Sequence, residues 1–366
     1  MKEFIVKDNE QQRLIKLLGK ILSNADNGFI YKMLRKKNIV LNDKKASGNE
    51  NLKTGDSIKI YFSDETFEKL SGKGTAVEEK SLIKGAKDND FVLKDSIIFE
   101  NDHVIFVNKP VGVLSQKAVK EDVSMVEYLT EYLLSEGKIS RDDLITFKPA
   151  ICNRLDRNTS GIILGGKSLL GLRTLNDIIS KRVIDKFYLT VVNGVLNREI
   201  KSEAFLYKNE NTNKVTVFNS VKEAKSVLNE REVSRLQAIK TGIRPLMSTN
   251  EHTLLEIELI TGKTHQIRAT MAHLGFPVYG DEKYKDKGSG KNGTTKTNNS
   301  YVDSKGGVHK SYQMLHAYKI VFKESCKTIG LDCKVYKAYP PKAFAETLKK
   351  LGFKEELLWD IIKEED

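Results

Sequence analysis

A single carboxylate stands among guanidinium groups in the stretch from Cys152 to Gly166, which reads CNRLDRNTSGIILGG. Asp156 lies between Arg154 and Arg157, and nearby positive charge favours the ionised form of a carboxyl group. Gly161 is a typical turn residue, and the apolar run after it predicts a buried strand. The residues therefore predict an ionised Asp156 on a tight loop where a core strand begins. An ordinary surface ion pair on a hairpin fits the same residues.

A second group of polar side chains follows the strand predicted at Leu254 to Ile260. The segment Thr261 to Arg268 reads TGKTHQIR, and Thr264 is a suitable N-cap for a helix. The apolar residues of that helix share one face: Ile267, Met271 and Leu274. His265 and His273 could bind a metal, but no cysteine or carboxylate pair stands at ligand spacing, so we expect no metal site.

Apolar periodicity predicts the elements that must position these two groups. They are a hairpin of Ile97 to Glu100 and Val104 to Val107, helices at Glu121 to Leu134 and Ser168 to Lys181, a strand at Val183 to Val192, surface hairpins around Lys222 to Arg235, and a final helix at Phe344 to Leu351.

Composition restricts the class of protein. The chain has 366 residues, 39% hydrophobic and 30% charged, which is enough for two domains and one sizeable core. No apolar run approaches the roughly 20 residues of a membrane helix, so we expect no membrane association. The N-terminus lacks an apolar signal core, which favours the cytoplasm. The three cysteines are expected to be reduced thiols, and the net charge of +12 favours a polyanionic partner.

The chain divides by composition into an N-terminal part, a linker and a larger body. Two amphipathic helical patterns lie within residues 10–35, and a polar stretch covers residues 64–92. Dense apolar strands begin at Phe91. We expect an α+β protein with a small domain at residues 1–70, a polar linker at 71–90 and a second domain at 91–366. The stretch from Lys285 to Lys310 predicts a basic loop that can touch an RNA backbone.

The segment RLDRNTSG around Asp156 resembles the RLDxxTSG signature of pseudouridine synthases of the RluA/RluC/RluD type. That family isomerises uridine to pseudouridine in structured RNA, and the aspartate of the signature is its catalytic residue. The resemblance therefore implies that Asp156 is catalytic. The family usually has His where this chain has Asn153, which can change how the loop is held or how RNA is gripped.

Four further segments resemble elements of the same family. The sequence DKFY, ending at Tyr188, resembles the K-x-Y motif, whose tyrosine packs beside the target base. TGKTHQIR resembles TGRTHQIR, whose last arginine pairs with the catalytic aspartate, so the resemblance implies a pair of Arg268 with Asp156. The departures from that motif are Lys263 and Thr270. The other two segments resemble the KPxG and HPxxGDxxY elements: Lys109 to Gly112 and Phe276 to Tyr284.

Residues 10–62 are similar to the S4 RNA-binding domain. Six Lys or Arg residues against one Asp lie between Tyr31 and Lys45. Such a cluster can neutralise phosphates, although a solvated helix end gives the same pattern. The residues expected to bind RNA are Arg35, Lys36, Lys37 and Lys44.

The resemblance implies a mixed, largely antiparallel catalytic sheet with flanking helices, and no cofactor. Asp156 would act with Tyr188 and Arg268, and Arg154 would help to extrude the base and hold phosphate. The carboxylate could attack C1′ or take a proton, and both remain open. We expect a monomer that modifies 23S rRNA. The alternatives are a synthase for tRNA or small-subunit rRNA, and a non-catalytic RNA-binding factor in ribosome assembly.

Overall fold

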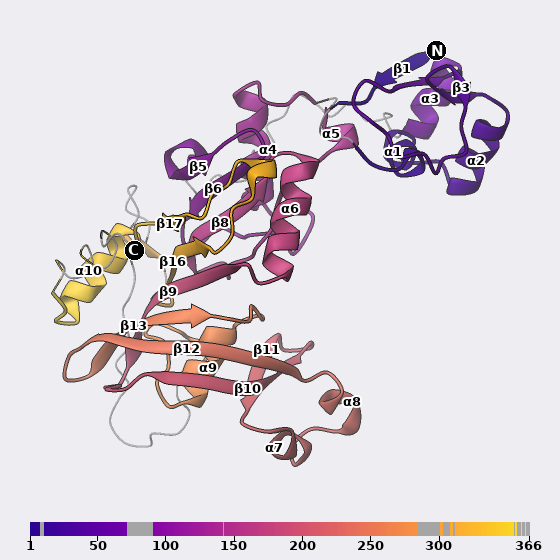
Figure 1. Ribbon diagram of the computed structural model, residues 1–366. Coiled ribbons are helices and arrows are strands. Elements are labelled where there is room, and N and C mark those ends of the chain that lie inside the picture. Colours follow the sequence, from indigo (N-terminus) through magenta and orange to yellow (C-terminus); the bar gives the residue numbers. More distant parts are fainter. Residues whose placement is uncertain are drawn as a thin grey trace.

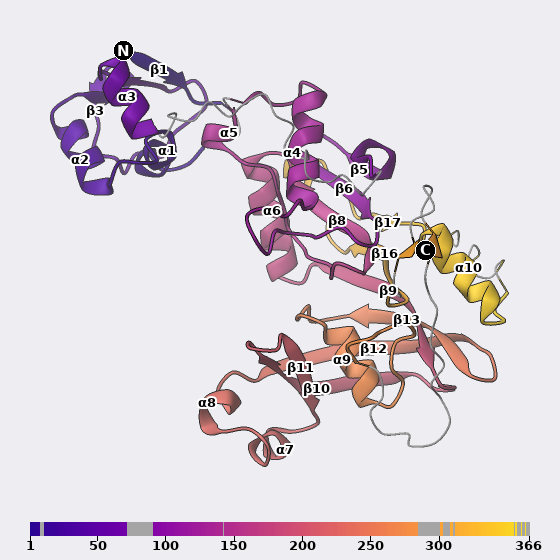
Figure 2. The same cartoon turned by 180° about the vertical axis from the view of Figure 1, so that it is seen from behind.

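The fold is described from a computed structural model of the chain (Figures 1 and 2). The structure describes residues 1–7, 11–71, 91–141, 143–284, 301–302, 308–309, 312–354, 356, 360 and 363. The predicted linker at 71–90 and the basic loop at 285–310 therefore lie almost entirely outside the described residues. No helix in the described part of the chain is both long and apolar enough to cross a bilayer.

The N-terminal unit has its own antiparallel sheet, in the order β1-β4-β2-β3, and its own apolar core. Helix α1 buries a stripe of leucine and isoleucine at helical spacing against that core. The Asp26 side chain caps α2 by accepting the Phe29 N–H at 2.8 Å. The elements are β1 (Lys2–Ile5), α1 (Leu14–Ile21), α2 (Asn27–Arg35), β2 (Ile39–Leu41), β3 (Lys44–Lys45), β4 (Ser57–Ile60) and α3 (Asp64–Ser71).

The larger body is built on one mixed sheet in the order β11-β10-β12-β13-β9-β16-β8-β6-β5, with β17 on β16 and β7 on β8. Among the described strands of this sheet, β16 and β8 pair in parallel and the other neighbours are antiparallel. The predicted mixed, largely antiparallel sheet with flanking helices is therefore confirmed.

The strands of the body are β5 (Ile97–Glu100), β6 (Val104–Lys109), β7 (Ala150–Ile151), β8 (Ser160–Gly166), β9 (Ile184–Asn193), β10 (Ile200–Asn209), β11 (Lys214–Phe218), β12 (Gln237–Ser248), β13 (His252–Leu259), β14 (Tyr301–Val302), β15 (Val308–His309), β16 (Leu315–Phe322) and β17 (Val335–Lys337). The helices are η1 (Leu93–Ser96), α4 (Met125–Ser135), α5 (Asp143–Thr146), α6 (Leu169–Ser180), α7 (Val221–Lys225), α8 (Glu230–Val233), α9 (Gln266–His273), η2 (Lys327–Ile329) and α10 (Lys342–Lys350).

Helices α4 and α6 cover opposite faces of strands β6 and β8 (Figure 1). Alternate strand residues such as Ile105 and Ile163 pack with Leu129 of α4, whereas Phe106 packs with Leu175 of α6. This two-residue period buries both faces of the strand pair. It explains why the run from Ile162 to Leu164 in β8 is apolar at every position.

Several predicted boundaries were wrong. The helix expected from Glu121 begins at Met125, because Ser124 and Glu127 form a capping box. The polar residues at the end of the predicted N-terminal domain form helix α3, for which no helix was predicted. The surface hairpins expected around Lys222 to Arg235 are the short helices α7 and α8.

Candidate active site

Asp156 lies on the loop between β7 and β8, and its neighbours fix the loop backbone. The Asn153 side chain spans the loop, donating to the Ile162 carbonyl at 3.0 Å and accepting the Leu164 N–H at 2.7 Å. The Ser115 hydroxyl likewise bonds the backbone of Leu155 twice, donating to its carbonyl at 2.7 Å and accepting its N–H at 3.0 Å. Asn153, which departs from the family pattern, therefore holds the loop.

A buried lysine supports this loop from below. Lys109 Nζ donates to the carbonyl oxygens of Pro110, Val113 and Arg157 at 2.9, 2.8 and 3.1 Å. Burial lowers the pKa of Lys109 to about 7, against the opposing effect of the Asp156 charge. The lysine of the KPxG-like element thus ties the end of β6 to the Asp156 loop.

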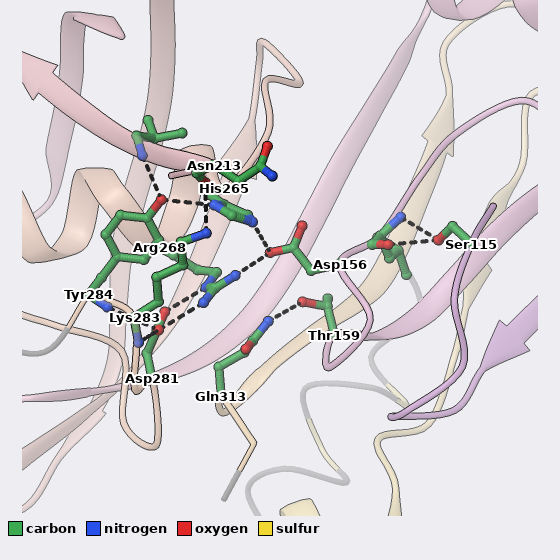
Figure 3. Close-up of polar contacts among 12 residues, drawn as sticks. Ser115, Asp156, Thr159, Asn213, His265, Arg268, Asp281, Lys283, Tyr284 and Gln313 are labelled. Carbon is green, nitrogen blue, oxygen red and sulfur yellow. Dashed lines mark hydrogen bonds and ion pairs between the residues drawn. The ribbon is translucent and has the colours of Figure 1, made fainter. Parts of the chain in front are cut away.

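Arg268 bridges two aspartates (Figure 3). Its NH1 donates to Asp156 Oδ2 at 2.6 Å, and its Nε and NH2 donate to the two carboxylate oxygens of Asp281 at 2.6 and 2.8 Å. The Arg268 and Asp281 side chains are 8% and 0% exposed, whereas the Asp156 side chain is 25% exposed. Burial alone lowers the pKa of Arg268, but the two carboxylates outweigh it and raise that pKa. The ion pair expected between Arg268 and Asp156 is present.

His265 lies near the same carboxylate oxygen of Asp156 that Arg268 contacts. Its Nε2 lies 3.8 Å from Asp156 Oδ2, and its Nδ1 lies 2.8 Å from the Tyr284 hydroxyl. That hydroxyl already accepts the Val215 N–H at 3.0 Å, so its own proton can go to His265 Nδ1, which leaves an Nε2–H toward Asp156. Burial lowers the pKa of His265, against the Asp156 charge, which favours this neutral form.

His265 is the N-cap of α9, with a left-handed φ of 54°, so the N-cap predicted at Thr264 was wrong by one residue. The next residue, Gln266, connects this turn to β12 because its side-chain amide makes hydrogen bonds through both its oxygen and its nitrogen. Its Oε1 accepts from Thr261 and from the Lys263 N–H, and its Nε2 donates to Lys240 O and Thr241 Oγ1. The bonds of Gln266 therefore support the strained backbone that aims His265 at Asp156.

Tyr188 lies in β9, paired with Ile257 of β13 and Ala317 of β16. It belongs to the main apolar core of the body and is 7% exposed. Burial, followed by the Asp156 charge, raises the pKa of its hydroxyl. Tyr188 is therefore a core aromatic whose hydroxyl lies within the influence of the Asp156 charge, and its expected contact with the target base stays a prediction.

The two arginines beside Asp156 in the sequence do not pair with it among the described residues. Arg157 donates from Nε to the Gly112 carbonyl at 3.0 Å. Arg154 is exposed, and no carboxylate in the described part of the chain binds it. The cation beside Asp156 comes instead from Arg268, 112 residues later. Arg154 therefore remains available to an anionic ligand.

The structure adds residues that the sequence reasoning did not assign to the site. Asp281 accepts the N–H groups of Lys283 and Tyr284 at 2.9 and 3.2 Å, which orients it for Arg268. Burial and the Arg268 charge lower the pKa of Lys283, whose Nζ bonds Asn213 O. The only signal for these residues was their place in the GDxxY-like element.

The basic cluster expected to bind RNA lies on the N-terminal unit. Arg35, Lys36 and Lys37 stand at the end of α2, and Lys44 is in β3; all four are exposed. The structure therefore does not bring them to Asp156. Among the described residues, no group of three or more His, Cys, Asp or Glu side chains could hold a metal ion.

Comparison with known proteins gives one consistent family. Residues 103–273 match the family described as RNA pseudouridylate synthase. An RNA pseudouridine synthase of Mycoplasma genitalium is 31% identical over 325 residues, which is 88% of each chain. The ribosomal large subunit pseudouridine synthase C of Rickettsia prowazekii is 31% identical over 276 residues, covering 75% of this chain and 82% of that one.

Among solved structures, human RNA pseudouridylate synthase domain containing 4 has a TM-score of 0.52 at 18% identity. The match covers 71% of this chain and 94% of that chain, which supports the shared fold. The identity to the bacterial relatives over most of both lengths supports more than the fold. The chain belongs to the RluA-type RNA pseudouridine synthases, enzymes that isomerise uridine in RNA.

Proposed function

We propose that this enzyme converts specific uridines of large-subunit rRNA to pseudouridine, with Asp156 as the catalytic residue. The observation that carries the proposal is the 2.6 Å contact of Arg268 with Asp156, in which the carboxylate keeps 25% of its side chain exposed. Arg268 is anchored by a second, fully buried carboxylate. The Asp156 carboxylate is thereby oriented, and the exposed part of its side chain can meet substrate.

The reaction breaks the N1–C1′ bond of uridine and rejoins the uracil through C5, without any redox change. A single carboxylate is suited to such an isomerisation, whereas glycoside hydrolysis usually needs two, one of them acting as acid. Asp281 is not a second acid, because Arg268 and backbone N–H groups occupy it. Asp156 either attacks C1′ or removes a sugar proton.

Two residues complete the proposed site. Tyr188 packs against the extruded uracil, since its hydroxyl lies within reach of the Asp156 charge and makes no hydrogen bond to another described residue. Arg154 holds phosphate and helps to extrude the base, because it is exposed on the Asp156 loop without a carboxylate partner in the described chain. Enzymes that act on a base inside a helix commonly extrude it.

The N-terminal unit is proposed to be an S4-type RNA-binding domain, spanning residues 1–70 and joined by the 71–90 linker to the catalytic domain at 91–366. Its two packed helices and small antiparallel sheet support this reading. Arg35, Lys36, Lys37 and Lys44 would bind phosphates there. Large-subunit rRNA is the proposed substrate because the names of similar enzymes specify it. We propose a cytoplasmic monomer.

The test is to map pseudouridines in the RNA of a strain that lacks the gene, and to complement it with wild type, Asp156→Asn or Asp156→Ala. Wild type should restore pseudouridine at defined large-subunit positions, and both variants should leave them as uridine while still binding RNA. Restoration by either variant removes Asp156 from catalysis. If the pseudouridines absent from the deletion strain lie in tRNA or small-subunit rRNA, the substrate is that RNA instead. If no pseudouridine is absent, an assembly factor is favoured.

A further inference from the structure

A pocket lies where the N-terminal unit meets the catalytic body, away from Asp156. Its volume is about 330 Å³, and its lining comes from the segment before and within α1, from the loop before β4, and from α6: Gln11, Gln12, Arg13, Lys16, Asn51, Leu52 and Arg173. Figure 1 shows α1 and α5 at the junction of the two units, with α6 beside α5. The pocket is therefore built by both units.

The charged residues that line this pocket within the described part of the chain are all cations. They are Arg13, Lys16 and Arg173, and the described lining contains no Asp or Glu. All three are exposed, and no ion pair joins them to a carboxylate among the described residues. Arg173 NH1 donates to the Gln11 carbonyl at 2.9 Å, which brings its guanidinium to the pocket and leaves its other N–H groups available. Three cations that no described carboxylate neutralises can attract an anion.

Gln12 supplies an independent sign of a missing ligand. Gln12 is only 7% exposed, and its buried Nε2 has no hydrogen-bond partner among the described residues. The orientation of the amide follows from Lys20, whose Nζ donates to Gln12 Oε1 at 3.1 Å. Buried amide N–H groups normally have an acceptor. The lining thus contains an unused donor as well as unpaired cations.

The same lysine fixes the two units against each other at this point. Lys20 Nζ also donates to the Thr146 carbonyl of the catalytic body at 2.9 Å. Lys7 and Asp143 form an ion pair across the same junction. These contacts therefore fix the basic side chains of the N-terminal unit in position relative to Arg173 of α6.

The pocket is remote from the catalytic loop. Leu172, next to Arg173, packs on Gly166 at the far end of β8, whereas the Asp156 loop enters β8 at Ser160. The strand between those ends spans about 20 Å at 3.3 Å per residue. A single nucleotide cannot occupy both places, but a structured RNA can.

We infer that this pocket binds a backbone phosphate of the RNA substrate at a distance from the modified uridine. The inference rests on the proposed function, because it takes the substrate to be rRNA. Arg13, Lys16 and Arg173 would supply the positive charge, and Gln12 Nε2 would donate to a phosphate oxygen. The site would set the orientation of the RNA across both units, without reading its sequence.

The experiment measures binding of transcribed large-subunit rRNA to the full-length protein between 50 and 200 mM salt. The double variant Lys16→Ala/Arg173→Ala should bind more weakly, and its plot of log affinity against log salt should be shallower by about one for each phosphate that the protein no longer neutralises. The matched control is Lys222→Ala/Arg231→Ala, which removes an exposed lysine and an exposed arginine on α7 and α8 (Figure 2). A pocket variant whose slope equals that of wild type or of the control overturns the inference.

Gln12→Leu tests the unused donor separately. It should weaken binding of the same RNA, because it removes the amide N–H group that would donate to phosphate. It also removes the Oε1 that accepts from Lys20 Nζ, so we expect a fall in melting temperature as well, and RNA binding is compared at a temperature where the variant is folded. Unchanged RNA affinity in the folded variant rejects Gln12 as a ligand and with it the proposed site. Inorganic phosphate, titrated alone, should bind far more weakly than RNA; phosphate binding as tight as RNA binding overturns the assignment to RNA. If wild type forms no pseudouridine but the pocket variants still show shallower salt slopes, the proposed function fails and the phosphate site stands.

Discussion

Arg268 and Asp281 form a two-point ion pair in which the guanidinium Nε and NH2 meet both carboxylate oxygens, at 2.6 and 2.8 Å. Asp281 is completely buried and also accepts two backbone N–H groups. The fork geometry of such a pair defines the plane and direction of the guanidinium. Only NH1 is then left to meet Asp156, so Asp281 positions the Asp156 carboxylate through Arg268.

We expect Asp281→Asn to lower kcat/KM by roughly 10–100-fold, because a neutral amide cannot hold both guanidinium nitrogens, and a small misplacement of reacting groups is costly. RNA affinity should stay near that of wild type. The measurements are single-turnover pseudouridine formation and RNA binding. Asp185→Asn is the control, since Asp185 pairs with Lys323 at a more exposed position. Wild-type kcat/KM in Asp281→Asn would contradict the positioning role.

Arg268→Met should lower the free energy of unfolding by about 3–5 kcal/mol, because it leaves the buried Asp281 carboxylate without its counter-charge. The double variant Arg268→Met/Asp281→Leu should recover at least half of that loss and should remain inactive. Urea denaturation and the pseudouridine assay measure the two effects. Arg244→Met is the comparison. Its partner Glu256 still accepts the hydrogen bond from the Tyr318 hydroxyl, so the loss of free energy of unfolding should be smaller. An equally unstable double variant would count against a charge effect.

Stability at acid pH should depend on His316. This residue is fully buried, accepts from Ser160 at Nδ1 and donates from Nε2 to the Ala338 carbonyl, and burial lowers its pKa to about 4. Between pH 4 and an unfolded pKa near 6.5, the unfolded chain binds one more proton than the native chain. Stability from this group is present above about pH 6.5 and falls, by up to about 3 kcal/mol, toward pH 4.

The measurement for His316 is the free energy of unfolding by urea from pH 4 to pH 7.5. His316→Asn should flatten this dependence, while His273→Asn, at an exposed position, should leave it as in wild type. A slope that survives in His316→Asn would assign the acid loss to other groups.

Lys109→Met should destabilise the protein by roughly 1–3 kcal/mol and reduce kcat, because the carbonyls of Pro110, Val113 and Arg157 lose their shared donor. The methionine keeps the length of the side chain, so packing changes little. Urea denaturation and single-turnover kinetics report the two effects. The matched control is Lys117→Met, at an exposed lysine, which should change neither quantity. An unaltered kcat in Lys109→Met would show that the hydrogen bonds from Lys109 to the loop do not affect catalysis.

Local residue patterns were sufficient for much of the architecture. The uninterrupted apolar run after Gly161 predicted strand β8, and Ser168 marked the start of α6, where it does accept the Gly171 N–H. These features depend on residues close in the chain, so spacing alone reveals them. The short polar helices α7 and α8 were missed because they bury little apolar surface and depend on caps from Ser220 and Asn229.

The sequence by itself determined the carboxylate, its loop and the family to which both belong. Only the tertiary structure decided which cation faces Asp156: Arg268, rather than either flanking arginine, because the sheet order β8-β16-β9-β13 brings the segment after β13 back beside the start of β8. The tertiary structure likewise decided the left-handed backbone of His265 and the pairing of the buried Asp281 with Arg268. Such contacts join segments far apart in the chain, and local propensity carries no information about which strands become neighbours.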